Sequence, residues 1–148
     1  MIITSRNVLG GALVAATLAF AGCGTMSGST VTTASNNMSA ASEVPPNESS
    51  GSGVVVTKLD KGTRTLHWTV SYSGLTGPVM AGHFHGPATP GVNAGVVVPF
   101  TGSLASPIEG SAVLTEAQMV DLTSGKWYAN LHTAAHPGGE IRAQIVGN

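Results

Sequence analysis

The sequence has little charge and almost no thiol chemistry. Of its 148 residues, 9% are Asp, Glu, Lys or Arg, and Cys23 is the single cysteine. One thiol excludes an intrachain disulfide, so the fold must rest on its own core. The sequence also shows no basic patch and no run of like charges. This removes the usual electrostatic basis for binding nucleic acid, and we expect no nucleic-acid partner.

The residue sets that hydrolases use are missing as well. Neither a Ser-His-Asp arrangement nor a pair of facing carboxylates stands out in the sequence. What is abundant is Gly, Ser, Thr and Val, which together with the low charge favours a small β-protein. The length suits one domain of ordinary size.

The N-terminal segment has no apolar run long enough for a comfortable membrane span. After Arg6, the apolar run 8–22 is shorter than the roughly 20 residues that a span needs and resembles a signal-peptide core. It ends in "LAFAGC", which resembles a bacterial lipobox. We therefore expect a signal peptide at 1–22 and a lipid on Cys23 through which the protein is attached to the membrane, its expected partner. By analogy with lipoprotein sorting, Gly24 then favours the outer membrane, so we expect a cell-envelope location on its periplasmic side or at the cell surface.

The rest of the chain divides into a tether and a domain. Residues 23–37 are Ser/Thr/Gly/Asn-rich without an apolar period, which predicts the lipidated cysteine and a flexible tether. The domain is expected at 38–148. Its short alternating segments predict an all-β fold, a single antiparallel β-sandwich or Greek-key barrel of about seven strands.

One short helix is expected within this β-rich pattern, at 116–123. Thr115 followed three residues later by Gln118 fits a capping box, which satisfies free N–H groups in the first turn. Gly125 supplies the expected C-terminal stop.

Two short blocks contain four of the five histidines. In "AGHFHGP", residues 81–87, His83 and His85 are two apart, so a strand projects both from one face while Phe84 points into the core. Such a pair can converge on one metal ion.

The second block, "HTAAHPGGE", supplies the other candidate ligands His132 and His136, with Glu140 as a fifth ligand or an acceptor for an imidazole N–H. On the strand that carries His132, alternation also places Asn130 and Tyr128 on the same face.

Other interpretations of these residues remain open at this stage. Surface and loop histidines are common. His67, which lies in neither histidine block, is expected to be an exposed strand residue. Arg142 shares a face with Glu140 and either orients that carboxylate beside the histidines or forms an ordinary ion pair or backbone contact. With no thiol in the domain, a metal must be held by imidazole and carboxylate. Copper is the first expectation and zinc the second.

Three segments resemble the CHRD domain, the module first named from chordin. They are "SEVPP" from Ser42, "SGLTGPVMAGHFHGPATPG", and "LTEAQMVDLTSGKWYANLHTAAHPGGEIRAQI" ending at Ile145. One departure is Ala143, where the family more often has glycine. The resemblance implies an extracytoplasmic β-sandwich module. Chordin binds growth-factor ligands, whereas bacterial members are exported proteins mostly without an assigned activity, so the resemblance supports fold and location better than function.

These observations predict an exported, lipid-anchored and non-catalytic CHRD module with a copper or zinc site. One alternative is a metal-free adhesion or structural module that binds a protein or glycan. A superoxide-dismutase-like copper enzyme is the other alternative, because an H-x-H pair on a β-sandwich is similar to part of that site. It is less favoured, because no ligand set for a second metal is evident in the sequence.

Overall fold

The computed structural model describes residue 2 and residues 31–148. The predicted signal-peptide cleavage point, the lipidation of Cys23 and the tether as far as residue 30 lie outside the described residues. Within the described residues, no helix combines the length and the hydropathy needed to cross a membrane.

The described chain is built from β-strands with one α-helix and one short 3-10 helix, η1. In chain order the elements are β1 (Val31–Ser39), η1 (Ala40–Ser42), β2 (Ser52–Asp60), β3 (Thr65–Ser73), β4 (Val79–His85), β5 (Val96–Pro99), β6 (Ile108–Val113), α1 (Glu116–Thr123), β7 (Trp127–Thr133) and β8 (Ile141–Ile145). The expected all-β fold class is confirmed, with eight strands where the sequence predicted about seven.

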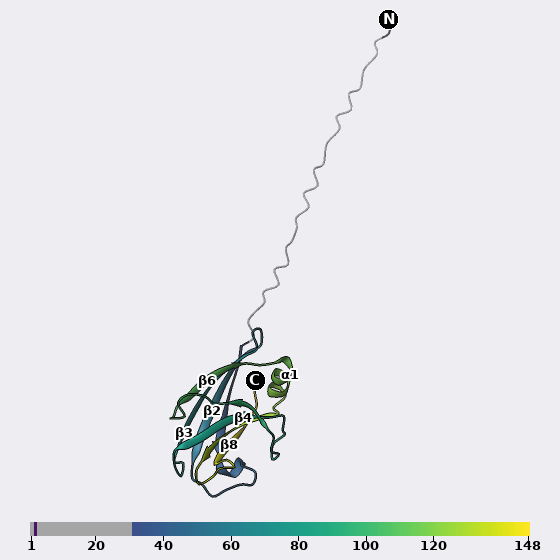
Figure 1. The fold of residues 1–148 in the computed structure, drawn as a ribbon. Helices are drawn as coiled ribbons and strands as arrows, with labels where there is room; N and C mark the ends of the chain where they lie inside the picture. Colours follow the sequence, from purple (N-terminus) through teal and green to yellow (C-terminus); the bar gives the residue numbers. More distant parts are fainter. Residues whose placement is uncertain (1, 3–30) are drawn as a thin grey trace.

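All eight strands belong to one antiparallel sheet in the order β5-β4-β7-β8-β1-β2-β3-β6. The sheet coils around a common core into a nearly closed barrel (Figure 1). The two four-stranded halves are linked where β8 meets β1, through the single residue pair Ser39 and Arg142. Strand β5, which contains Pro99, lies at one end of this order, as expected for a residue that cannot donate to a ladder.

The tether prediction was wrong for residues 31–37. These residues lie in β1, which pairs along its whole length with β2, from Val31 opposite Asp60 to Ser39 opposite Ser52. The segment was read as a linker because Thr, Ser and Asn dominate it. Its exposed polar side chains alternate with Ala34, Asn36 and Met38, which are buried, so one face still contributes to the protein interior.

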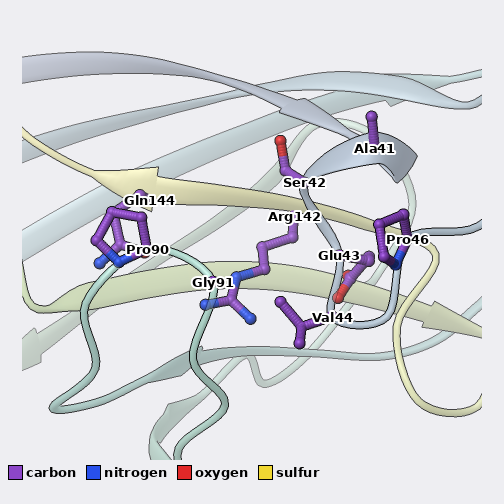
Figure 2. Close-up of a pocket in the computed structure, with 9 residues that line it drawn as sticks. All are labelled: Ala41, Ser42, Glu43, Val44, Pro46, Pro90, Gly91, Arg142 and Gln144. Carbon is purple, nitrogen blue, oxygen red and sulfur yellow. The ribbon is translucent and has the colours of Figure 1, made fainter.

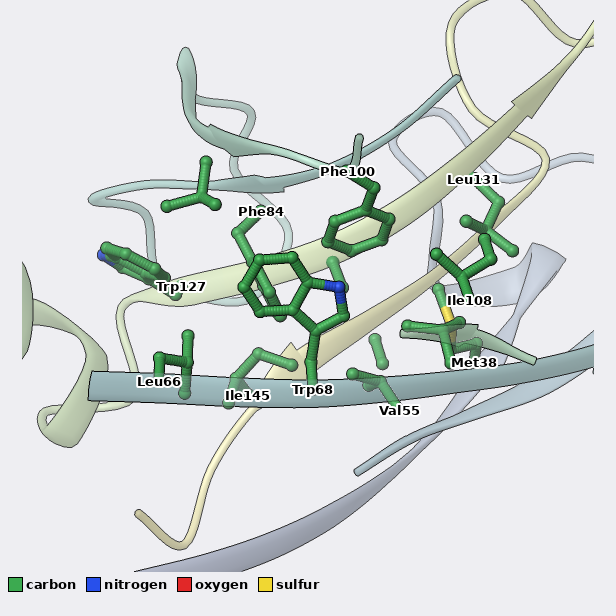
Figure 3. Close-up of a cluster of buried hydrophobic side chains, with 14 of the residues drawn as sticks. Met38, Val55, Leu66, Trp68, Phe84, Phe100, Ile108, Trp127, Leu131 and Ile145 are labelled. Carbon is green, nitrogen blue, oxygen red and sulfur yellow. The ribbon is translucent and has the colours of Figure 1, made fainter. Parts of the chain in front are cut away.

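The core lies between the two halves of the sheet and centres on aromatic rings (Figure 3). Trp68 stacks on Phe100 with ring centroids 5.4 Å apart and meets the edge of Phe84 at the same distance. Trp127 packs on the other side of Phe84 at 5.9 Å. The predicted inward direction of Phe84 is confirmed by its full burial.

The helix occurs where the sequence predicted it, at Glu116–Thr123. The side chain of Thr115 accepts a hydrogen bond from the Gln118 N–H, and the side chain of Gln118 accepts one from the Thr115 N–H. Gly125 follows the helix with a φ of +71°, a left-handed conformation that glycine adopts without strain.

Strand β4 presents two chemically different faces because its residues alternate. Gly82 and Phe84 face the core, and a Cβ at Gly82 would lie 2.5 Å from the Phe100 ring and 2.8 Å from Leu131. The missing side chain therefore lets Phe100 pack directly against the strand. His83 and His85 are left on the opposite face, where the candidate site lies.

Candidate metal centre

The two histidine blocks meet because β4 pairs with β7. The register places His83 opposite Asn130, His85 opposite Tyr128 and Ala81 opposite His132. One ring nitrogen from each of His83, His85 and His132 lies within 4.8 Å of the other two. His83 Nδ1 and His132 Nε2 are 3.2 Å apart. Residues almost fifty positions apart in sequence thus form one cluster.

His85 is the buried member of this cluster, with 8% of its surface exposed. Its ring stacks on Tyr128 at 4.8 Å, with the two planes 2° apart. Its Nδ1 lies 3.0 Å from the Ala94 carbonyl oxygen, which can only accept, so Nδ1 carries the proton. The lone pair is then on Nε2, which is buried without a hydrogen-bond partner in the described part of the chain.

His132 is held in the same tautomer. Its Nδ1 lies 2.9 Å from the Pro137 carbonyl oxygen and donates to it, which leaves the lone pair on Nε2. That Nε2 faces the neighbouring imidazole of His83. A backbone carbonyl that fixes the tautomer of a histidine is the usual outer partner of a metal-ligating imidazole.

The surroundings favour the neutral forms of His83 and His132. Burial lowers the pKa of His83, and repulsion from His132 and His85 lowers it further. Burial also lowers the pKa of His132, against the opposing effect of its bond to Pro137, and His85 adds to the lowering. Neutral imidazole is the form that binds a metal.

One pair of imidazoles in the cluster already has the spacing of two ligands on one transition-metal ion. Two ligands bound at about 2.0–2.1 Å lie about 2.9 Å apart at a right angle and about 3.4 Å apart at the tetrahedral angle. The 3.2 Å between His83 and His132 falls inside that range. His83 and His132 are half-buried, whereas His85 forms the floor, so the cluster opens towards solvent on one side.

Glu140 does not belong to this cluster. Its side chain is fully buried. One carboxylate oxygen accepts hydrogen bonds from the Ser49 hydroxyl and the Thr76 N–H, and the other from the hydroxyls of Thr76 and Thr133. Although burial opposes ionisation, these four donors lower the pKa of Glu140 to about 2. The carboxylate ties together three chain segments and has no lone pair directed at the histidines.

His136 is not in the cluster either. It lies in the turn between β7 and β8, where its peptide N–H bonds to the Thr133 carbonyl. It lines a separate hollow that it shares with Glu43 and Asn47. The turn folds back over the end of β7, and it brings the Pro137 carbonyl to His132 instead of the second imidazole.

Arg142 donates to a neighbouring loop, through one side-chain and one backbone acceptor, and not to Glu140. With 2% of its surface exposed, it donates to Asn93 Oδ1 at 2.9 Å and to the Val92 carbonyl at 2.7 Å. Its guanidinium lies 3.4 Å above the Tyr128 ring. Arg142 thereby fixes the loop that carries Ala94, the acceptor for His85 Nδ1. Of the interpretations that the sequence left open, the backbone contact is the one observed.

Two polar residues beside the site had no role in the sequence-based prediction. Alternation placed Asn130 on the correct face, but its amide gave no sign of a role, and Glu43 lies in the segment SEVPP, which carried the family resemblance but indicated no function. Glu43 has 5% of its surface exposed, and burial raises its pKa to about 7, although Arg142, Asn130 and Val44 favour the ionised form. Glu43 and Arg142 line a cavity of about 450 Å³ whose walls include Pro46 and Pro90 (Figure 2).

Comparison with known proteins places the chain by its family. No curated protein and no solved structure matches it. The model of the CHRD domain does match, over residues 34–145, which includes both histidine blocks and most of β1. The match covers well over half of the chain, and the protein therefore belongs to the CHRD domain family.

Proposed function

We propose that this CHRD domain is a non-catalytic binding module that holds one transition-metal ion through His83, His85 and His132. The observation that carries the proposal is the buried Nε2 lone pair of His85, which has no partner within the described residues and belongs to a cluster of three imidazoles. An unpaired buried acceptor costs about 1–3 kcal/mol, and a bound cation removes that cost.

Copper is the ion we propose first, and zinc second. The ligands are imidazole nitrogens, which suit both metals, and copper(II) binds a given nitrogen site more tightly than zinc. No carboxylate or thiolate joins the group among the described residues. A soft thiolate site or a hard oxygen cage for calcium or magnesium would need a different ligand set.

Metal titration tests this proposal. Purified protein with Cys23→Ser, so that the single thiol supplies no ligand, is titrated with copper(II) and with zinc by calorimetry and metal analysis. We expect one ion per chain with a Kd below about 10 μM, the weakest affinity that would count as a specific site. His85→Ala is expected to weaken binding at least 100-fold, by losing one ligand of three.

Two histidines provide matched controls for that titration. His67→Ala removes an exposed imidazole from β3, and His136→Ala removes a half-buried one from the nearby turn. Both variants should keep the affinity of the starting protein. Equal losses in all the histidine variants, or no binding by the starting protein, would contradict the proposal. The second result would favour the metal-free alternative, a module that binds a protein or glycan, for which the cavity beside Arg142 offers a place.

The same samples test the catalytic alternative. The half-exposed His83 and His132 leave one side of the cluster accessible, so a small oxidant would be able to reach the ion. We expect copper-loaded protein to turn over superoxide no faster than the same amount of copper bound to His85→Ala protein. Metal-dependent turnover above that control would support a superoxide-dismutase-like enzyme.

Export and lipid anchoring are part of the proposal and rest on the sequence around Cys23. We expect the protein made in a lipoprotein-processing bacterium to start at Cys23 and to carry a diacylglyceryl group there. Mass spectrometry of the protein from the envelope fraction measures both features. An unmodified N-terminus in wild-type protein, or an unchanged mass and membrane association in Cys23→Ser, would contradict lipidation.

A further inference from the structure

Asn130 lies against the histidine cluster and is almost fully buried, with 3% of its surface exposed. It sits on β7 between β4 and β8, opposite His83 on one side and Arg142 on the other. Its Oδ1 lies 3.0 Å from His132 Nε2. A buried amide in this position needs partners for both its oxygen and its nitrogen.

The contacts of His132 with Asn130 and Pro137 require one more N–H than a neutral imidazole has. His132 faces two acceptors, because the Pro137 carbonyl oxygen lies 2.9 Å from Nδ1 and Asn130 Oδ1 lies 3.0 Å from Nε2. A neutral imidazole has one N–H and can donate to only one of them. With the proton on Nδ1, the lone pairs of Nε2 and Asn130 Oδ1 face each other across 3.0 Å, and a positive charge between or beside them relieves this repulsion.

Rotating the amide would remove this conflict, but Glu43 opposes the rotation. Asn130 lies beside the Glu43 carboxyl group and favours its ionised form, as the amide does when Nδ2 points towards the carboxylate. Gly139 permits this contact, because a Cβ there would lie 2.8 Å from Asn130 Nδ2 and would also overlap Glu43. Gly139 has a φ of +130°, where other residues are strained. The amide nitrogen is thus directed to Glu43 and the oxygen to His132.

A second proton on His132 or a metal ion at its Nε2 would each resolve the conflict. A second proton on His132 Nε2 would donate to one acceptor, so it would account only for the contact with Asn130 Oδ1. Nε2 also has His83 Nδ1 at 3.2 Å, and the unpartnered His85 Nε2 belongs to the same group. Asn130 Oδ1 and His83 Nδ1 therefore both lie within 3.2 Å of His132 Nε2, and one ring nitrogen of each of the three histidines lies within 4.8 Å of the other two. A metal ion would use a lone pair from each of these three histidines and from Asn130, with the His83 proton on its other ring nitrogen, whereas a proton on His132 uses one pair.

We infer that Asn130 Oδ1 is the fourth ligand of the metal site, which makes it a site of three nitrogens and one amide oxygen. The inference rests on the proposed metal-binding function. The 3.0 Å between Oδ1 and His132 Nε2 equals the separation of two neighbouring ligands of one ion, about 2.9–3.4 Å. Glu43 is then a positioning residue that fixes the amide, and Arg142 provides charge for Glu43.

Substitutions at Asn130 test the inference with copper(II) as the probe, in the full chain carrying Cys23→Ser. Asn130→Ala should weaken copper binding 10- to 100-fold. Asn130→Asp, nearly the same shape, should bind at least as tightly as Asn130, because a charged oxygen replaces a neutral one. In the electron paramagnetic resonance spectrum, Asn130→Asp should shift g∥ and A∥. Asn36→Ala, which removes another buried asparagine on β1, should change neither affinity nor spectrum.

The outcomes distinguish an Asn130 that binds the metal from an Asn130 that only lies beside His132. Unchanged affinity and spectrum in Asn130→Ala would overturn the inference and leave the three-histidine site intact. Weaker binding in both Asn130 variants, with the spectrum of the starting protein retained in Asn130→Asp, would show that Asn130 only positions His132, and would also overturn it. If the starting protein binds no copper, the proposed function itself fails. Circular dichroism checks folding, and Asn130→Asp keeps the test decisive if Asn130→Ala does not fold.

Discussion

Glu140→Gln is expected to lower the free energy of unfolding by about 4 kcal/mol at pH 7, because charged hydrogen bonds contribute about 1.5–3 kcal/mol each. The carboxylate is fully buried and accepts four hydrogen bonds, from Ser49, Thr76 and Thr133. Glutamine offers one acceptor oxygen and an NH₂ group that faces donors. At least two buried donors therefore lose their acceptor. Urea unfolding followed by circular dichroism measures the change.

The pH dependence of stability provides a second test of Glu140. Its pKa falls from 4.5 to about 2 on folding, so its contribution is complete above pH 4.5 and is lost as the pH falls through 2. At about 1.36 kcal/mol per pKa unit, that contribution is about 3 kcal/mol in wild-type protein. It should be absent from Glu140→Gln. Glu48→Gln, an exposed control, should change stability by less than about 0.5 kcal/mol. A similarly small effect at Glu140 would contradict this assignment.

Glu43→Gln is expected to change stability in the opposite direction at high pH. Burial raises the pKa of Glu43 from 4.5 to about 7, so the folded state favours the protonated form. Its stabilising contribution is complete below pH 4.5 and is lost as the pH rises through 7, at a cost of about 3 kcal/mol to wild-type protein. Glutamine resembles the neutral form at every pH. Relative to wild type, Glu43→Gln should therefore gain about 3 kcal/mol between pH 4 and pH 8.5.

Only the difference between the two proteins isolates Glu43. The lowered pKa values of His83 and His132 act in the opposite sense, because their contribution is present above pH 6.5 and is lost at lower pH. These terms are common to wild type and variant, so they cancel in the difference. Paired urea titrations at pH 4, 5.5, 7 and 8.5 in metal-free buffer give the curve. A difference that stays flat across this range would contradict the burial effect at Glu43.

Local patterns determined most of the fold. Short β-rich segments separated by turn residues predicted the strands from residue 52 onwards, and alternation supported this where one face is buried, because a half-buried strand repeats every two residues. The capping box at Thr115 determined where the helix begins, because its two hydrogen bonds are local. Residues 31–37 were misassigned because composition outweighed a weak alternation, in which Ala34, Asn36 and Met38 occupy the inward positions.

The site was only partly predictable, because local patterns do not determine which strands pair. The same-face pair His83 and His85 follows from strand geometry alone. That His132 joins them and His136 does not depends on the pairing of β4 with β7 and on the path of the turn after β7. Sequence proximity suggested Glu140, but the long-range donors Ser49 and Thr76 occupy its carboxylate.

The sequence by itself determined the β-architecture, the helix, the family and which face of β4 carries imidazoles, because each of these depends on short-range periodicity or on a local motif. Only the tertiary structure decided which candidate ligand atoms come together. Strand pairing brings His132 to His83, the Ala94 and Pro137 carbonyls fix the tautomers of His85 and His132, and Glu43, almost ninety residues away in sequence, lies beside Asn130. Ligand direction depends on hydrogen bonds between distant segments, and no pattern within one segment encodes those.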